Sequence, residues 1–452
     1  MKDIHKTFYN MEISENLFNI ELSDGTKYWD IIRREVFAAI NKYNKDKFQT
    51  NKDNFKFFSQ LTDKLKDISK LFLNYLILRY IVKKKPKYIF TTFQRNQKNG
   101  RIFDNIVDHL YLILKSDSVC VEGVNKKSIS FKKILNLNET RVPPVFIYRS
   151  SVKNDIDGIN ASLNEAIYKH FKIKLDLSAV ITNSLNTFVT TRNFYQQLLK
   201  IHKPKAFFCS DDGTMKGLYS AARSNNITIF EIQHGASPGS ILWNYPKELS
   251  SNDNGIITPD IFLTFSEYWN SNLKFPVKEK ISIGNDNLYT PKINGTDGIA
   301  FLSNNNINED LINLAIQLEK YKINNRIFFK LHPQQYGNKA KIINSLPSAS
   351  NITVLSDEMN NNEILKNVNH FVAVRTSLIY VALQAGKSLY LYKKNNYDWD
   401  KELIKIANVF SNEKQLYNAI FKENNINNKY KNIPTYFSKF NEEKFLDILD
   451  KI

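Results

Sequence analysis

Short apolar segments alternate with amphipathic stretches along most of the 452-residue chain. Tyr88–Phe93 (YIFTTF) is β-branched and aromatic and too short for a helix, and Arg101–Leu114 (RIFDNIVDHLYLIL) has apolar residues at helical spacing. This order of strand, loop and helix predicts an α/β fold with parallel sheets. The other predicted strands are Ser118–Glu122, Ala206–Cys209, Ile227–Ile232, Asp260–Phe265, Lys280–Ile283, Ile299–Leu302, Arg326–Leu331, Ile352–Leu355, His370–Val374 and Leu389–Tyr392.

The segment Thr290–Gly298 (TPKINGTDG) divides the alternating pattern into two units, because its proline and two glycines favour a linker. We therefore expect a Rossmann-like domain over residues 86–290 and a second over 299–430, facing each other across a cleft. The pattern of residues 1–85 predicts a helical N-terminal extension. Residues 431–452 contain an amphipathic helix, Phe437–Ile452, that is long enough to return to the first domain.

Composition excludes several classes of protein. A hydrophobic content of 42% is too high for wholesale disorder. Two cysteines, Cys120 and Cys209, are too few for a disulfide framework and fit a reducing cytosol. The N-terminus lacks the apolar core of a secretory signal. Lys and Arg outnumber Asp and Glu by 63 to 45, a net charge of +18, but they are spread along the chain without a nucleic-acid-binding motif, so no nucleic acid partner is expected.

One segment resembles a membrane segment. Residues 68–82 (ISKLFLNYLILRYIV) are mostly apolar, but Lys70 and Arg79 lie inside the segment, and Lys83–Lys85 follow it. About 20 apolar residues are needed to span a bilayer, so this segment is either a buried helix or an interfacial one that contacts anionic lipid. The sequence thus favours a cytoplasmic protein and leaves open a peripheral contact with the inner face of the plasma membrane.

Polar residues follow several predicted strands, and ligands of open parallel sheets bind at the carboxyl ends of strands. Asp211, Asp212 and Gly213 come after the strand AFFC. A carboxylate on such a turn can accept a proton from a hydroxyl nucleophile. The alternative is that it caps the following helix.

His332 and Pro333 follow the strand RIFFKL in the second unit. A histidine there can donate a hydrogen bond to a phosphate or act as a general acid, or it is simply a loop residue. Thr376 and Ser377 lie between a strand and a helix N-terminus, which is a natural phosphate site if they do not only cap the helix, and Arg375 can add a positive charge.

A fourth strand end carries Gln233, His234 and Gly235. Glycine there permits a close approach of the backbone to a ligand, and catalytic, substrate-binding and structural roles stay equally open for the histidine.

Several familiar signatures are absent from the sequence: GxxxxGK[ST], GxGxxG and HExxH. Its two Asp-x-Asp sequences, Asp155–Asp157 and Asp398–Asp400, do not follow apolar strands, so we interpret them as surface carboxylates. We expect no metal and no cofactor, with side chains and backbone dipoles stabilising the phosphate instead.

Taken together, the Asp-Asp-Gly, His-Pro and Thr-Ser elements resemble the motif set of bacterial sialyltransferases and polysialyltransferases of the GT-B fold, and the Gln-His-Gly turn is similar to that of capsule-type Kdo transferases. The resemblance covers roughly residues 200–390, and Thr376 replaces the first Ser of the family pattern. It implies a transferase that moves sialic acid or Kdo from a CMP-activated donor to a glycan or glycolipid. Asp211 would be the general base, His332 would assist departure of the CMP phosphate, and Thr376 and Ser377 would hydrogen-bond it.

Two alternatives remain. CDP-glycerol-type polyol-phosphate transferases also carry an HG turn, an LHP element and a Ser-Ser element, and in that case His234 would be the base and Asp211 a helix cap. The other alternative is a non-catalytic protein that binds carbohydrate or membrane as a partner in a polysaccharide assembly complex. The Asp-Asp-Gly turn favours the sugar transferase. The choice between sialic acid and Kdo, the stereochemical outcome, the acceptor and the oligomeric state stay open.

Overall fold

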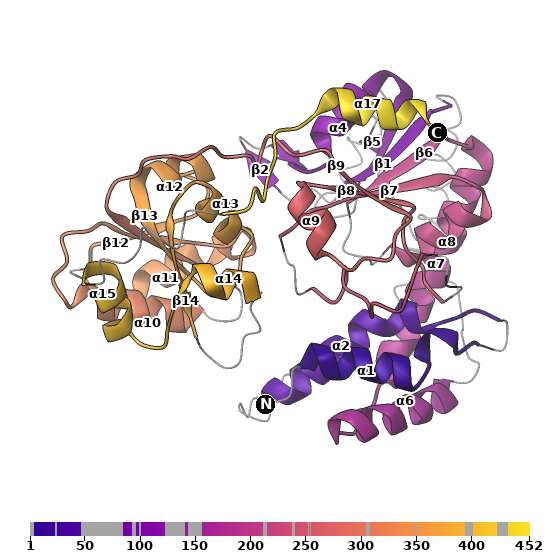
Figure 1. The fold of residues 1–452 in the computed structure, drawn as a ribbon, viewed down its shortest axis with the longest axis horizontal. Helices are drawn as coiled ribbons and strands as arrows, with labels where there is room; N and C mark the ends of the chain where they lie inside the picture. Colours follow the sequence, from indigo (N-terminus) through magenta and orange to yellow (C-terminus); the bar gives the residue numbers. More distant parts are fainter. Residues whose placement is uncertain are drawn as a thin grey trace.

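The computed structural model describes residues 4–22, 25–46, 85–92, 96–98, 101–122, 141–142, 156–210, 215–236, 240–251, 253, 255–303, 308–348, 350–393, 401–422 and 433–452. These form a group of N-terminal helices and two α/β domains (Figure 1). Asp211–Gly213, the apolar segment 68–82, Lys83 and Lys84 lie outside the described residues. So do Asp155, Asp398 and Asp400.

The first domain is built on a seven-stranded sheet in which every pairing is parallel. Its strand order is β5-β4-β1-β6-β7-β8-β9. The bounds are β1 Tyr88–Thr92, β4 Ser118–Glu122, β5 Arg141–Val142, β6 Ala206–Cys209, β7 Thr228–Ile232, β8 Ile261–Thr264 and β9 Glu279–Ser282. A short antiparallel pair, β2 Asn96–Lys98 and β3 Arg101–Phe103, stands beside it. The helices and 3-10 turns of this part are α4 Asp108–Ile113, η2 Lys115–Asp117, α7 Ser178–His202, α8 Lys216–Ser224 and α9 Glu267–Asn272.

The second domain has a six-stranded parallel sheet in the order β12-β11-β10-β13-β14-β15. Its strands are β10 Gly298–Leu302, β11 Ile327–Lys330, β12 Ile352–Leu355, β13 Val368–Ala373, β14 Ser388–Tyr392 and β15 Asn408–Phe410. Its helices and turns are α10 Asn308–Glu319, η3 Pro333–Asn338, α11 Lys339–Asn344, α12 Asn361–Asn367, α13 Leu378–Gln384, α14 Lys401–Ile406 and α15 Glu413–Phe421.

Both sheets have the strand order of a Rossmann fold. Counted along the chain within each sheet, the strands lie in the order 3-2-1-4-5-6, with a seventh added at the edge of the first sheet. The order reverses between β1 and β6 in the first sheet and between β10 and β13 in the second. The predicted α/β class with two Rossmann-like domains is therefore confirmed, and the returning C-terminal helix completes the GT-B arrangement.

Alternation of side chains along the strands explains how the first sheet is covered on both faces. Phe90, Phe208 and Phe230 lie on neighbouring strands and stack with ring centroids 4.5 and 4.7 Å apart. Phe445 of the C-terminal helix contacts this stack, 6.0 Å from Phe208. The adjacent Phe207 instead meets Tyr195 of α7, at 5.4 Å, so that α7 and the C-terminal helix lie on opposite faces.

The N-terminal helices pack together below the first domain in the view of Figure 1, on the opposite side from α17. α1 (Ile4–Ser14), the short turn η1 (Leu17–Asn19) and α2 (Trp29–Asp46) are joined by α6 (Ile156–Phe171), which contacts α1. α2 also contacts the long helix α7. The sequence pattern predicted helices near the N-terminus, but it did not indicate that residues 156–171 form a helix packed against them.

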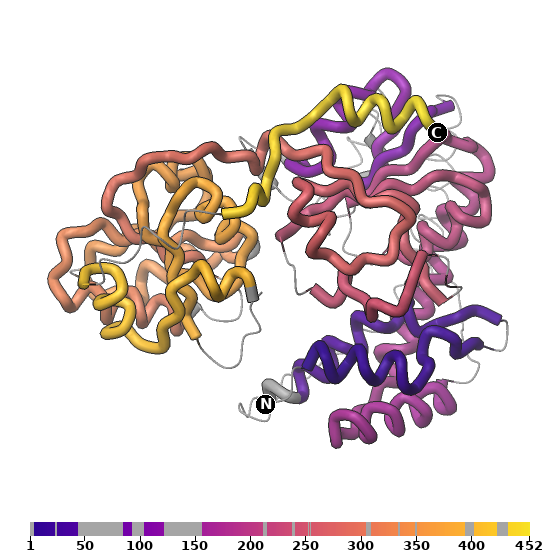
Figure 2. The backbone as a smooth tube through the Cα atoms, in the orientation of Figure 1, coloured from indigo at the N-terminus to yellow at the C-terminus, as the bar shows by residue number. Residues whose placement is uncertain are grey.

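The C-terminal segment crosses from the second domain back to the first (Figure 2). Gln384 of α13 clamps it, because its side-chain amide accepts from the backbone N–H of Phe437 and donates to the carbonyl of Phe437, both at 2.8 Å. On the first domain, the Ser438 N–H donates to the carbonyl of Phe265 and the Asn441 N–H to that of Ile283.

The C-terminal helix α17 spans Glu442–Asp450, which is shorter than the predicted Phe437–Ile452. The apolar residues Phe437 and Phe440 belong to the extended crossing segment, whose backbone groups bond to both domains rather than to one another. Asn441 caps the helix, since its side chain accepts from the N–H of Lys444. The apolar spacing correctly predicted a C-terminal helix. Its first predicted residues are extended instead, because their backbone groups form hydrogen bonds with the two domains.

His109 of α4 supports the crossing segment and makes the fold sensitive to acid. Its ring meets the edge of Phe440, with centroids 4.9 Å apart. Burial lowers the pKa of His109 to about 4, although the Asp286 and Asp104 carboxylates oppose the shift. The unfolded chain takes up a proton near pH 6.5 and the folded chain only near pH 4, so stability is lost as the pH falls through this window.

Replacing His109 with phenylalanine removes this titration while keeping a ring against Phe440. Between about pH 7.5 and pH 4.5, we expect the wild type to lose roughly 2–3 kcal/mol more unfolding free energy than His109→Phe. Urea unfolding at both pH values measures the difference. Equal losses in the two proteins would show that His109 is not the group responsible.

Candidate functional site

The predicted site residues follow the carboxyl ends of strands in both sheets. Thr376 comes after β13, the strand at the point where the order of the second sheet reverses. His332 comes after β11, two strands away, which corresponds to roughly 10 Å along the sheet. In the first sheet, His234 comes after β7, which neighbours β6, the strand preceding Asp211 in sequence. Such edges are where ligands of open α/β sheets bind.

His332 stands on a short, well-anchored turn. Its backbone N–H donates to Ser303 Oγ at 2.8 Å and to Gln335 Oε1 at 3.3 Å, and Ser303 Oγ in turn donates to the same Gln335 oxygen. Pro333 begins the 3-10 turn η3 directly after it. The imidazole is half-buried, and this burial lowers the pKa of His332 from its ordinary value. At neutral pH the ring is therefore predominantly neutral.

Thr376 and Ser377 differ in what their hydroxyls do. Thr376 Oγ1 accepts from the N–H of Leu378 at 3.4 Å, which is a local contact at the start of α13. Ser377 makes no such capping bond. Its Oγ instead accepts from the backbone N–H of Ala236, in the other domain, at 3.1 Å. The side chain of Arg375 is exposed.

The side chain of Gln233 fixes the turn Gln233–Gly235. Gln233 is fully buried, its Oε1 accepts from the Phe265 N–H and its Nε2 donates to the Gly235 carbonyl, both at 3.0 Å. Both ends of the Gln233 amide are thus occupied by hydrogen bonds to the backbone. A Cβ built on Gly235 would lie 3.8 Å from Ser377 Oγ, so the backbone of this turn approaches the second domain closely.

His234 lies beside Gly235 and packs against Trp243. The two rings meet edge to face with centroids 5.1 Å apart, and the imidazole is half-buried. The structure thus brings the Gln233–Gly235 turn close to Ser377 across the domain boundary. It places His332 on the same edge as Thr376. The site roles of all these residues stay predictions.

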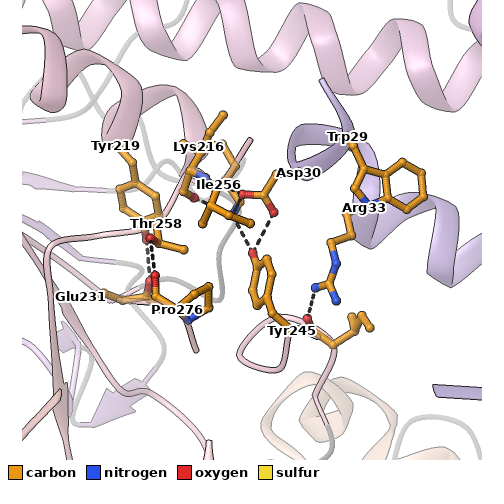
Figure 3. A network of polar contacts seen from close by, with 12 residues as sticks. Trp29, Asp30, Arg33, Lys216, Tyr219, Glu231, Tyr245, Ile256, Thr258 and Pro276 are labelled. Atoms are coloured by element: carbon orange, nitrogen blue, oxygen red, sulfur yellow. Dashed lines mark hydrogen bonds and ion pairs between the residues drawn. The ribbon is translucent and has the colours of Figure 1, made fainter. Parts of the chain in front are cut away.

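Sequence reasoning missed the N-terminal helices as neighbours of this region (Figure 3). Arg33 of α2 donates to the carbonyls of Ile241 and Asn244, at 2.5 and 3.0 Å, in the connection between β7 and β8. Asp30 accepts from Lys216 Nζ at the start of α8 and from the Tyr245 hydroxyl, both at 2.8 Å. These partners are about 190 to 215 positions apart in the chain, so no local pattern could reveal them.

The metal prediction stays open. Across the parts of the chain that the structure describes, no group of three or more His, Cys, Asp or Glu side chains is arranged to hold a metal ion. Asp157, the one described residue of the two Asp-x-Asp sequences, is exposed in the first turn of α6, as a surface carboxylate would be. Among the described helices, none combines the length and the apolar character needed to cross a bilayer.

No family model matches the sequence, and no curated protein does either. Solved structures with a similar fold include MurG of Acinetobacter baumannii, at 12% identity over 81% of this chain and 100% of that one, with a TM-score of 0.46. MnaA of S. aureus, in a co-structure with UDP, matches at 12% identity over 81% and 96%, with a TM-score of 0.47. UDP-GlcNAc 2-epimerase of Methanocaldococcus jannaschii, in complex with UDP-GlcNAc and UDP, matches at 13% over 81% and 99%, with a TM-score of 0.46. These values are too low to carry an inference about donor or reaction, so the fold assignment rests on the strand order.

Proposed function

We propose that the protein is a metal-independent GT-B glycosyltransferase of capsule or lipopolysaccharide synthesis, which moves sialic acid or Kdo from a CMP-activated donor to a hydroxyl of a glycan or glycolipid. The observation that carries this proposal is the contact between the Ala236 N–H and Ser377 Oγ. It joins the carboxyl edges of two Rossmann sheets, and such edges are the ligand-binding edges of this fold. The substrates would meet between them.

In this reaction a bond forms between the acceptor oxygen and the anomeric carbon of the donor, and the bond from that carbon to the CMP phosphate breaks. Asp211 takes the acceptor proton, and the phosphate takes the negative charge. His332, predominantly neutral because burial lowers its pKa, donates one N–H to the phosphate. Ser377 accepts a hydrogen bond from Ala236 and still has its own hydroxyl hydrogen to donate.

One observation favours a second candidate, the CDP-glycerol-type polyol-phosphate transferase. The turn that approaches Ser377 carries His234, and in that enzyme class His234 would be the base. Asp211 would then take no part in the chemistry; the expected helix cap does not fit, because α8 begins at Lys216 with Met215 in the N-cap position. The two candidates share the fold, the edge and the phosphate-binding residues, and they differ in the base and in the donor.

A contact with an anionic membrane surface belongs to the same proposal, because such a transferase handles lipid-linked acceptors. Its basis is the net charge of +18 and the basic residues Lys83–Lys85, of which Lys85 is described and exposed. Equal binding to neutral and anionic vesicles would contradict it.

The donor class is tested by adding CMP-, CDP- and UDP-activated donors to the purified protein. A ligand at 100 times its dissociation constant stabilises the folded state by about 2.7 kcal/mol, so the cognate donor should raise the melting temperature measurably. We expect this shift, together with slow release of CMP, for a CMP-sugar. Stabilisation by UDP-sugars alone would refute the donor, and stabilisation by CDP-polyols alone would favour the second candidate.

A further inference from the structure

Trp243, in the segment following β7, contacts His234 and approaches Gly235. Only 2% of it is exposed. Its ring meets the His234 imidazole edge to face at 5.1 Å, and its Cη2 lies 3.9 Å from the position that a Cβ on Gly235 would occupy. The position of the indole therefore constrains both residues of the turn at once.

The sheet holds the indole through Glu231, a fully buried residue near the end of β7. Glu231 Oε1 accepts from Trp243 Nε1 at 3.0 Å, and Oε2 accepts from the Tyr219 hydroxyl at 2.7 Å. A buried carboxylate needs its hydrogen-bond donors, because leaving it undersatisfied costs the free energy of its desolvation. Trp243 is thus fixed to the strand that ends in the turn.

The N-terminal helices bind the backbone on either side of Trp243. Arg33 donates to the carbonyls of Ile241 and Asn244, which flank Trp243 in the chain. Its guanidinium is fixed by Glu12, a fully buried residue of α1, through Nε at 2.5 Å and Nη2 at 3.1 Å. One rigid guanidinium fork thus spans the backbone on both sides of the indole.

We propose that Trp243 is a positioning residue for the His234 turn, held by Glu231 from the sheet and by Arg33 from the N-terminal helices. The inference rests on the proposed function, because the turn it positions meets Ser377 of the other domain through Ala236. A displaced turn changes the distance between acceptor-side and donor-side groups, and a misplacement of about 1 Å can cost on the order of 100-fold in rate. Through Arg33, the N-terminal helices thereby help to position the site.

Two phenylalanine variants separate positioning from stability. Trp243→Phe removes the Nε1–H and shortens the ring that meets His234. Tyr219→Phe removes another donor to the same carboxylate, the hydroxyl that bonds Glu231 Oε2, from an equally buried side chain of α8. We expect similar falls in melting temperature for both variants. Only Trp243→Phe should lower kcat, by about 10- to 100-fold, with KM for the donor unchanged.

A readout independent of activity comes from the imidazole itself. The protein has seven histidines, so a spectrum of ¹³C-histidine-labelled protein is resolvable, and His234→Asn identifies the His234 signal by its loss. Trp243→Phe should shift this signal, because the indole ring current acts on it, whereas Tyr219→Phe should leave it in place. Glu231→Gln, which keeps an acceptor oxygen for Trp243, should also leave it in place.

The outcomes distinguish the inference from the function on which it rests. An unshifted His234 signal in Trp243→Phe, or equal kcat losses in both phenylalanine variants, would overturn the positioning role. Absence of transfer by the wild type with every donor would overturn the proposed function, while the His234 signal would still decide the geometry. If Trp243→Phe does not fold, Glu231→Gln and Glu231→Leu provide the same comparison, with a shift expected only for leucine.

Discussion

Replacing Lys216 with methionine should lower the free energy of unfolding by about 3–5 kcal/mol, the usual cost of removing one partner of a buried ion pair. Lys216 Nζ lies 2.8 Å from Asp30 Oδ2, and both residues are almost fully buried (Figure 3). The variant leaves the Asp30 carboxylate inside the protein with only neutral donors, the Tyr245 hydroxyl and the Ile257 N–H. Burial raises the pKa of Tyr245 well above its usual value, so its hydroxyl stays neutral.

Urea unfolding of Lys216→Met beside Lys278→Met measures this effect. Lys278 pairs with Asp260 at 2.6 Å, but its side chain is 64% exposed, so this control should lose less than about 1 kcal/mol. The double variant Asp30→Leu/Lys216→Met removes both charges and should lose less than the sum of the two single variants. If Lys216→Met costs no more than Lys278→Met, the ion pair does not hold the N-terminal helices to the first domain.

Replacing Asp211 with asparagine should lower kcat of sugar transfer by about 10²- to 10⁴-fold, the range attributed to a general base. Asparagine keeps the size of the side chain but cannot take the acceptor proton. The melting temperature should change little if Asp211 acts on substrate. Steady-state assays with the cognate donor measure kcat and KM separately, and the loss should fall on kcat.

Two further variants show whether a loss of activity is specific to Asp211 and which residue is the base. Asp157→Asn applies the same substitution to an exposed carboxylate of α6 and should leave the activity unchanged. His234→Asn tests the second candidate. A severe loss in His234→Asn with an active Asp211→Asn would make His234 the base and favour the polyol-phosphate transferase.

The strands and their polar ends were predictable because they depend on local pattern. A buried parallel strand needs a short run of β-branched and aromatic residues, and β1, β6, β7 and β11 all carry one. The residues that follow such a run must lie at the carboxyl edge of a sheet. His332, Thr376 and His234 therefore entered the candidate site from sequence alone.

The order of the strands was not predictable in this way. Sequence indicates that β6 and β13 are strands, but only hydrogen-bonded pairing shows that each is the fourth strand of its sheet and lies where the order reverses. The residues after them, Asp211 in one domain and Thr376 in the other, thereby follow equivalent strands. Pairing joins residues far apart in the chain, and no local spacing encodes it.

What the sequence by itself determined is thus the α/β class and the polar strand ends, since these depend on residues a few positions apart. Only the tertiary structure decided that Ser377 meets Ala236, and that Arg33 and Asp30 of the N-terminal helices hold the segment after the His234 turn. Buried charges such as these are stable only where folding brings their partners to them from distant parts of the chain. Their role is therefore decided by the fold rather than by any motif.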